Sequence, residues 1–139
     1  MASRLNPYIS YPGTARDALT FYEGIFGGTL ALSTFGEFGD KNAPEADKIM
    51  HGMLETDRGF TLMCADNPPG QELTPGNNMS VSLSGDGADG DALRGYFTKL
   101  ADGGTVTVPL EKQMWGDEFG MCIDKFGIAW MVNIAQAQG

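Results

Sequence analysis

Histidine is nearly absent from this sequence of 139 residues, which contains a single one, His51. No two-histidine metal site can therefore be built within one chain, and one histidine alone does not establish a Ser-His-Asp or Cys-His arrangement. Cysteine is almost as scarce, with Cys64 and Cys122 as the two examples. Both lie in apolar strand patterns, so we expect reduced, structural thiols rather than a disulfide framework.

Positive charge is also in short supply. The chain has 9 Lys and Arg residues against 18 Asp and Glu residues, which gives a formal net charge of -9. This balance argues against nucleic acid or an anionic membrane surface as partner, since both require clustered positive charge. No apolar run approaches the roughly 20 residues that span a bilayer, and the amino terminus lacks the apolar block of a secretory signal. We expect a cytoplasmic protein whose partner is a small organic molecule.

The sequence contains an internal repeat. When its C-terminal part is aligned on its N-terminal part, Gly52 falls on Gly120 and Gly59 falls on Gly127, so the glycine spacing is the same in both copies. The same alignment pairs Met53 with Met121, Leu62 with Trp130 and Met63 with Met131. Each copy shows apolar alternation on either side of a tight turn that contains Gly, which is the pattern of a β-hairpin.

A strand pattern and a helix pattern precede each hairpin. Residues 6–11 lead into a helix that stops at two glycines before Thr29, and residues 78–83 lead into a helix that stops at two glycines before Thr105. The order strand, helix, strand, hairpin therefore occurs twice, which is too few copies for a solenoid. We predict an α+β fold in one domain, 1–139, with internal pseudo-two-fold symmetry. Its parts are a first module at 1–66, a linker at 67–77 and a second module at 78–139.

Several local features carry expectations of their own. Thr14 stands where a helix cap is needed, so we expect its side chain to satisfy a free amide at the start of the first helix. Residues 36–47 form a loop without a counterpart of this length in the second module, and this loop is the best candidate for a mobile lid. The segment GDGADG at 85–90 matches G-x-G-x-x-G, but its aspartates would oppose a pyrophosphate, so we interpret it as an acidic turn. The first strand of the second module is expected at 79–84.

Four segments together resemble the PhnB-like branch of the vicinal oxygen chelate superfamily, which includes glyoxalase I, bleomycin-resistance proteins and extradiol dioxygenases. They are NPYISYPGTARDALTFYEGIFGG, KIMHGMLETDRGFTLMCAD, FTKLADGGTVTVPLEKQMWGDEFG and DKFGIAWMVN. The resemblance covers nearly the whole chain. It implies two βαβββ modules whose mixed sheet curls around one cavity, and it implies a homodimer.

The resemblance also implies a divalent metal ion held by His and Glu, with one ligand from each of four strands. The repeat alignment places these four positions on or beside Asn6, Met63, Asn78 and Met131, with Tyr8 as an alternative on the first strand. None is a usual ligand, because hard and borderline divalent ions favour carboxylate oxygen or imidazole nitrogen. We therefore predict no metal ligands and no cofactor, while a divalent metal bound through unexpected residues stays open.

Strand alternation predicts one conventional core face and one face that mixes Met, Tyr, Ser and Asn around a ligand cavity. The residues expected to line this cavity are Asn6, Tyr8, Ser10, His51, Met63, Asn78, Ser80, Trp115, Met131 and Asn133. His51 is either a catalytic base or a hydrogen-bonded structural histidine. Met63 and Met131 either contact the ligand or plug the cavity, and Trp115 either rims the pocket or packs at the dimer interface.

Three functions of different class follow. The first is a metal-independent protein of the PhnB-like branch that binds a small molecule, of a sequestering or resistance type. The alternative is an enzyme of the same superfamily, a lyase, isomerase or dioxygenase, with a recruited metal or with His51 as base. A methyltransferase ranks last, because the sequence contains no Rossmann module that would bind adenosylmethionine.

Overall fold

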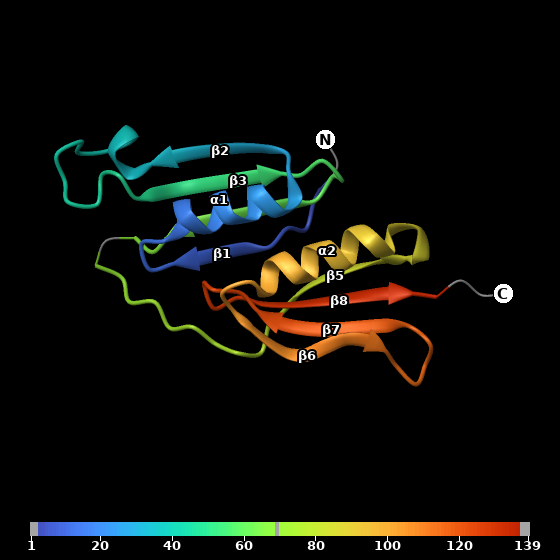
Figure 1. Ribbon diagram of the computed structural model, residues 1–139. Coiled ribbons are helices and arrows are strands. Elements are labelled where there is room, and N and C mark those ends of the chain that lie inside the picture. The colour runs from blue at the N-terminus through green and yellow to red at the C-terminus, as the bar shows by residue number, and fades with distance from the viewer. Residues whose placement is uncertain (1–2, 69, 137–139) are drawn as a thin grey trace. The chain divides into compact units, whose positions relative to one another are not determined.

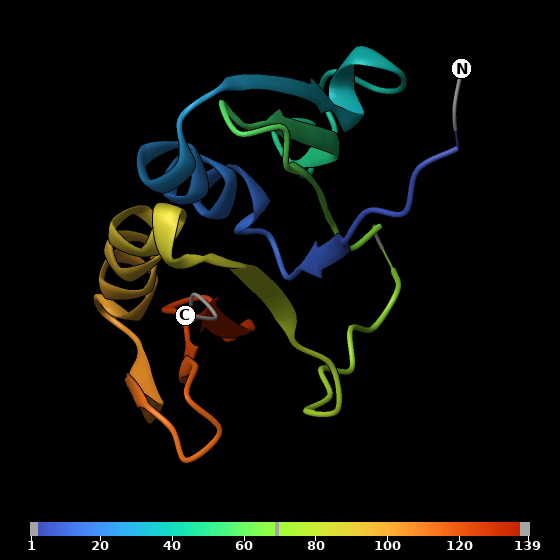
Figure 2. The ribbon, with the colours of Figure 1, turned by 90° about the vertical axis from the view of Figure 1, so that its right-hand side faces the viewer.

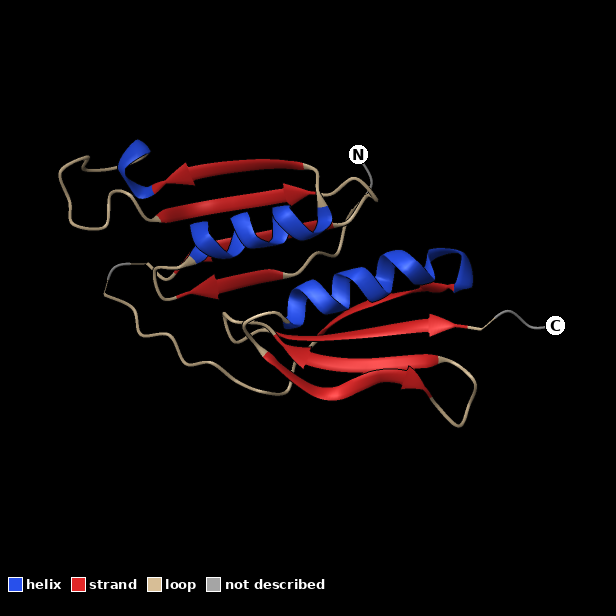
Figure 3. Ribbon diagram, viewed as in Figure 1, coloured by secondary structure: helices blue, strands red, loops and turns tan. Residues whose placement is uncertain are grey.

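The computed structural model describes residues 3–68 and 70–136, and the chain divides into two compact units, Met1–Pro75 and Gly76–Gly139 (Figure 1). Each unit contains one α-helix and one four-stranded mixed sheet in the order strand, helix, strand, hairpin (Figure 3). The two βαβββ modules predicted from the repeat are thereby confirmed. None of the helices within the described residues combines the length and the apolar character that crossing a bilayer requires.

In unit 1 the sheet has the strand order β1-β4-β3-β2. The first strand runs parallel to the last, while the other neighbours are antiparallel. This order puts the first and last strands of the module side by side, with β1 at the edge of the sheet. The elements are β1 (Tyr8–Tyr11), α1 (Ala15–Phe26), β2 (Thr29–Thr34), the 3-10 helix η1 (Phe35–Glu37), β3 (Ile49–Glu55) and β4 (Thr61–Asp66).

Unit 2 repeats this topology with the strand order β5-β8-β7-β6. Its elements are β5 (Val81–Asp86), the 3-10 helix η2 (Gly87–Asp89), α2 (Gly90–Ala101), β6 (Thr105–Lys112), β7 (Glu118–Ile123) and β8 (Ala129–Ala135). The first strand begins at Val81, so the prediction of a strand at 79–84 was wrong by two residues. The GDGADG segment forms the end of β5, η2 and the first residue of α2, and the Asp86 carboxylate accepts a hydrogen bond from the amide of Ala88.

The core of unit 1 lies between α1 and one face of its sheet (Figure 2). Gly52 of β3 faces the helix, because a Cβ atom at this position would overlap Cδ1 of Leu19. Strand alternation then puts Leu54 on the same face, and the register adds Leu62 and Cys64 opposite these two residues. The buried apolar residues of α1 that oppose this face are Ala15, Ala18, Leu19, Tyr22, Ile25 and Phe26.

Both hairpins turn through a glycine with positive φ, and this part of the repeat is confirmed in detail. Gly59 and Gly127 have φ values of 85° and 90°, a region that favours glycine over residues with a Cβ atom. Their amides donate to the carbonyl oxygens of Thr56 and Asp124 at 3.0 Å and 2.9 Å. The turns therefore share one backbone conformation, with a threonine in one copy and an aspartate in the other.

The buried Asp124 holds more than its own turn together. Its Oδ1 accepts hydrogen bonds from the amides of Phe126 and Ile128, and its Oδ2 accepts one from Nε1 of Trp130 at 2.9 Å. The indole of Trp130 is fully buried and needs an acceptor for its N–H group. Asp124 supplies this acceptor and so fixes the largest side chain of the unit 2 core.

The loop at 36–47, predicted to be a mobile lid, is tied to its surroundings by hydrogen bonds. The amide of Gly36 donates to the carbonyl of Ala46 at 3.0 Å, which closes the loop on itself. Nη2 of Arg16, on α1, donates to the carbonyl of Asp47 at 3.2 Å. Its action as a lid stays a prediction.

The start of α1 is capped by a residue from the other end of the module. Thr14 makes no side-chain cap, contrary to expectation. Instead, Oδ1 of Asp66 accepts a hydrogen bond from the Ala15 amide at 2.9 Å, and its Oδ2 accepts one from the Ile49 amide at 2.8 Å. Asp66 ends β4 and is 4% exposed. One buried carboxylate therefore joins α1, β3 and β4.

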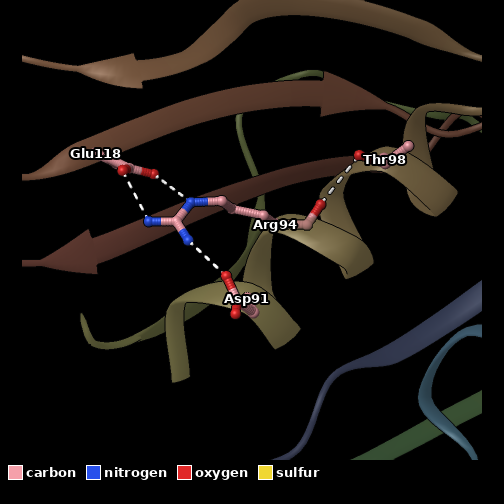
Figure 4. A network of polar contacts seen from close by, with 4 residues as sticks. All are labelled: Asp91, Arg94, Thr98 and Glu118. Atoms are coloured by element: carbon pink, nitrogen blue, oxygen red, sulfur yellow. Dashed lines mark hydrogen bonds and ion pairs between the residues drawn. The ribbon is translucent and has the colours of Figure 1, made fainter. Parts of the chain in front are cut away.

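In unit 2 a surface ion-pair network joins the helix to the sheet (Figure 4). Nε and Nη2 of Arg94, on α2, donate to the two carboxylate oxygens of Glu118 on β7 at 2.9 Å each. Nη1 of the same guanidinium pairs with Asp91 at 3.0 Å. The hydrogen bonds from Arg94 lower the pKa of Glu118, and the Glu118 carboxylate in turn raises the pKa of Arg94.

We predict that Asp66→Ala lowers the free energy of unfolding by about 2 to 4 kcal/mol, because it leaves two buried amides without an acceptor. Urea denaturation followed by circular dichroism measures this change. Asp47→Ala is the control, because Asp47 is exposed and contributes its backbone carbonyl to the Arg16 contact. Equal losses in the two variants would show that Asp66 does not anchor the module.

The pair of Glu118 with Arg94 should make stability depend on pH. A carboxyl group whose pKa is lowered by folding stabilises the protein above its ordinary pKa, and this contribution disappears as pH falls through the lowered value. We therefore expect Glu118→Gln to be less stable than the wild type at pH 7. The difference should shrink as pH falls below about 4.5, the ordinary pKa of the carboxyl group, and vanish below its lowered pKa. Thermal unfolding across this range tests the prediction, with the exposed Glu111→Gln as control. A difference that stays constant from pH 7 to pH 3 would contradict it.

Candidate functional site

The candidate site lies on the open face of unit 1, by which we mean the sheet face that α1 does not cover. The register aligns Tyr8 with Met63, Met63 with Met53 and Met53 with Ala31, which makes one row across all four strands. This row alternates with Gly52 and Leu54, which face the helix, so it belongs to the open face. The open face comprises Tyr8, Ser10, Thr29, Ala31, Ser33, His51, Met53, Glu55, Thr61, Met63 and Ala65.

The phenol of Tyr8 meets the imidazole of His51 on this face. Tyr8 Oη lies 3.4 Å from His51 Nδ1, and the two ring centroids are 5.8 Å apart. Tyr8 comes from β1 and His51 from β3, with β4 between them. The two side chains therefore meet across the middle strand of the open face.

This pair can present either kind of polar group to a ligand. If Tyr8 donates to Nδ1, the proton of the imidazole is on Nε2, which can then donate a hydrogen bond outward. If Nδ1–H donates to the phenol oxygen instead, Nε2 offers a lone pair. Tyr8 is 54% exposed and His51 is partly exposed, so solvent and solutes reach both rings.

Unit 2 has a related face with different polar groups. Its register aligns Ser82, Met131, Met121 and Val108 in one row, and Ser84, Asn133, Phe119 and Glu111 in the next. The repeat therefore keeps the pair of cross-strand methionines. It places Phe119 in the position that His51 has in unit 1.

Two predicted site residues of unit 2 have partners within that unit. Nδ2 of Asn133 donates to Oδ2 of Asp117 at 3.2 Å. The rings of Trp115 and Phe119 lie 6.3 Å apart, with Trp115 mostly exposed in the loop that joins β6 to β7. Asn133 and Phe119 are opposite each other in the register, so these contacts form one group at this end of the sheet.

The register shows which residues of β1 and β5 belong to these faces. Tyr8 is aligned with Met63 and Ser82 with Met131, whereas Asn6 precedes β1 and Asn78 and Ser80 precede β5. The expected positions Asn6, Asn78 and Ser80 therefore lie outside the strands. The structure does place Tyr8, Ser10, His51 and Met63 together on one face.

Met53 and Met121 are the cross-strand partners of Met63 and Met131, and they were not among the residues predicted to line the cavity. The repeat alignment contained the signal, because both residues follow the repeated glycines Gly52 and Gly120. Each methionine is one residue from a glycine that lies on the helix-covered face, so alternation alone assigns it to the opposite face.

The residues present do not fit the divalent ion that the resemblance implies. The strand positions that replace the expected ligands carry a phenol and a thioether in unit 1, and a hydroxyl and a thioether in unit 2. Thioethers suit soft ions, whereas divalent ions of this kind favour carboxylates and imidazoles. Across residues 3–68 and 70–136, no three His, Cys, Asp or Glu residues come together in a group that could hold a metal ion.

The two thiols are unsuited to nucleophilic chemistry. Cys64 and Cys122 are buried on the helix-covered faces of their sheets. Burial raises the pKa of Cys122 to about 11, with a further contribution from the charge of Asp124. With this raised pKa, Cys122 is almost entirely protonated at neutral pH. The thiolate, which is the reactive form, is therefore scarce.

Comparison with known proteins identifies the family. A family model described as the glyoxalase/bleomycin resistance protein/dioxygenase superfamily matches residues 4–132. Protein PA1353 from Pseudomonas aeruginosa is 37% identical with a TM-score of 0.84, over 98% of this chain and 100% of that one. Protein YjdN of Escherichia coli (strain K12) is 27% identical over 96% of this chain and 97% of its own length.

A solved structure from Bacillus cereus has the same fold. It is described as a putative 3-demethylubiquinone-9 3-methyltransferase, PhnB protein, and it is 24% identical with a TM-score of 0.75, over 96% of this chain and 100% of that one. The family match extends over both units and so includes the whole of the open face of unit 1. The chain belongs to the glyoxalase/bleomycin resistance protein/dioxygenase superfamily.

Proposed function

We propose that this chain binds a small organic molecule on the open face of unit 1, as a sequestering or resistance-type protein. The observation that carries the proposal is the contact of Tyr8 with His51 beside Met63. An aromatic pair with an exposed polar edge, next to adaptable thioethers, suits an organic ligand that has both an apolar body and a hydrogen-bonding group.

The charge of this surface limits the ligand further. The row of Tyr8, Met63, Met53 and Ala31 has no ionised side chain, and the next row carries the carboxylate of Glu55. The chain as a whole has a net charge of -9. A strongly anionic ligand would be repelled by this field without a positive partner on the row. We therefore expect a neutral or weakly charged molecule.

The related enzymatic functions have less support. A metal-dependent lyase, isomerase or dioxygenase would need ligands that the strand positions of Tyr8, Met63, Ser82 and Met131 do not supply. The methyltransferase description belongs to the Bacillus cereus relative, whose identity of 24% supports the fold alone. Cytoplasmic location and a homodimer remain part of the proposal, and sedimentation of the purified protein measures the dimer.

A thermal-shift screen of neutral and weakly charged organic compounds supplies the probe. For a compound that binds, we expect Tyr8→Phe and His51→Gln each to weaken the affinity by about tenfold, the equivalent of one hydrogen bond to a polar ligand group. Isothermal titration calorimetry measures both constants. Each variant keeps a side chain of similar size, so the loss reports the polar contact.

Thr20→Ala is the matched control, because Thr20 is exposed on α1, which covers the other face of the same sheet. Its affinity should equal that of the wild type. A ligand that binds the wild type and both site variants with equal affinity would place the binding surface elsewhere and overturn the proposal.

A further inference from the structure

We propose that His51, Met53 and Met63 form a site for a soft monovalent metal ion, Cu(I) in the cell or Ag(I) as its analogue. All three residues belong to the open face of unit 1 and come from the neighbouring strands β3 and β4. This proposal goes beyond the binding of an organic molecule and does not depend on it.

The register places the two sulfur atoms within reach of one ion. Met53 and Met63 are directly opposite each other in an antiparallel pair, where Cβ atoms are about 5 Å apart. Methionine is unbranched and has three rotatable bonds, so each thioether can turn toward a point between the strands. Both side chains are partly exposed, which leaves a path for an ion.

The third ligand comes from the same face. His51 is two residues before Met53 on β3, so strand alternation points both side chains the same way. The contact with Tyr8 shows that the imidazole extends toward β1, where Tyr8 is aligned with Met63 of β4. The ring therefore extends over β4, on the side of the sheet where Met63 lies.

The partner of Nδ1 leaves the other nitrogen available. A histidine that binds a metal usually donates its remaining ring N–H to a nearby acceptor, which fixes the tautomer and the ring orientation. Tyr8 Oη, at 3.4 Å from Nδ1, is placed for this role. With the proton on Nδ1, the lone pair of Nε2 is free for the ion.

The chemistry of the donors selects the ion. Thioethers favour Cu(I) among the biological metals, and an imidazole completes a neutral set of one nitrogen and two sulfur atoms. The same set disfavours Mg(II), Ca(II) and Mn(II), which take oxygen ligands. A net charge of -9 adds a field that attracts a cation.

Unit 2 provides a built-in comparison. Met121 and Met131 are opposite each other in β7 and β8, as Met53 and Met63 are in β3 and β4. Phe119 stands at the position equivalent to His51. The second pair of methionines therefore has the same register without an imidazole, and we expect it to bind the ion far more weakly.

The test is a titration of Ag(I) into tag-free, reduced protein whose methionine methyl groups carry carbon-13, followed by NMR. We expect the methyl signals of Met53 and Met63 to move up to one equivalent of Ag(I), before those of Met121 and Met131. Affinity for Cu(I) is measured by competition with bicinchoninate. Met53→Leu, Met63→Leu and His51→Ala should each weaken binding by at least about tenfold, while Met121→Leu should not.

Buried thiols also bind soft ions, so the cysteines need a separate control. The variant with Cys64→Ala and Cys122→Ala should keep the same shifts of Met53 and Met63. If that variant does not fold, Cys64→Ala alone replaces it, because Cys64 is the thiol next to Met63 in the chain. The shifts of Met53 and Met63 should persist in it. The proposal is overturned by methyl signals of Met53 and Met63 that stay in place, or by equal losses in Met53→Leu and Met121→Leu.

Discussion

Burial of each sheet against its own helix is the constraint on which the rest of the structure depends. In unit 1 the contact is so close that a Cβ atom at Gly52 would overlap Cδ1 of Leu19 unless that side chain moved. Because side chains alternate along a strand, fixing Gly52 toward α1 also fixes His51 and Met53 toward the other side. A shift of one residue in β3 would bury His51 and expose Leu54. The composition of the open face is therefore a consequence of core packing, and Tyr8 joins it through the parallel pairing of β1 with β4.

The two modules share topology but differ in their polar anchors. In unit 1 the buried carboxylate of Asp66 ties the start of α1 to β3. In unit 2 the buried carboxylate of Asp124 fixes a hairpin turn and the indole of Trp130, and the helix is joined to β7 by Arg94 at the surface. The repeat thus preserves the apolar pattern and the glycine turns, whereas the buried carboxylates occupy different positions in the two modules. This asymmetry fits a fold in which only one unit keeps a histidine on its open face.

Much of the fold could be predicted from the sequence, because helix and hairpin patterns are local and occur twice. The start of β5 could not, since Met79 and Ser80 continue the alternation of a strand although both residues are exposed before Val81. The role of Asp66 could not be predicted either, because its hydrogen bond to Ala15 joins residues that are distant in the chain. The same holds for the contact of Tyr8 with His51, which depends on the strand order. Alternation predicted which residues share a face, and only the register showed which of them meet.

The proposed binding site depends on the contact between Tyr8 and His51. The most direct test of this contact needs no ligand. Nitrogen-15 NMR of the imidazole reports separately on Nδ1 and Nε2 and shows which one is hydrogen-bonded. We expect Tyr8→Phe to shift the Nδ1 resonance of His51 and to change the balance of its two neutral tautomers. Identical imidazole spectra for the wild type and Tyr8→Phe, in two folded proteins, would contradict it.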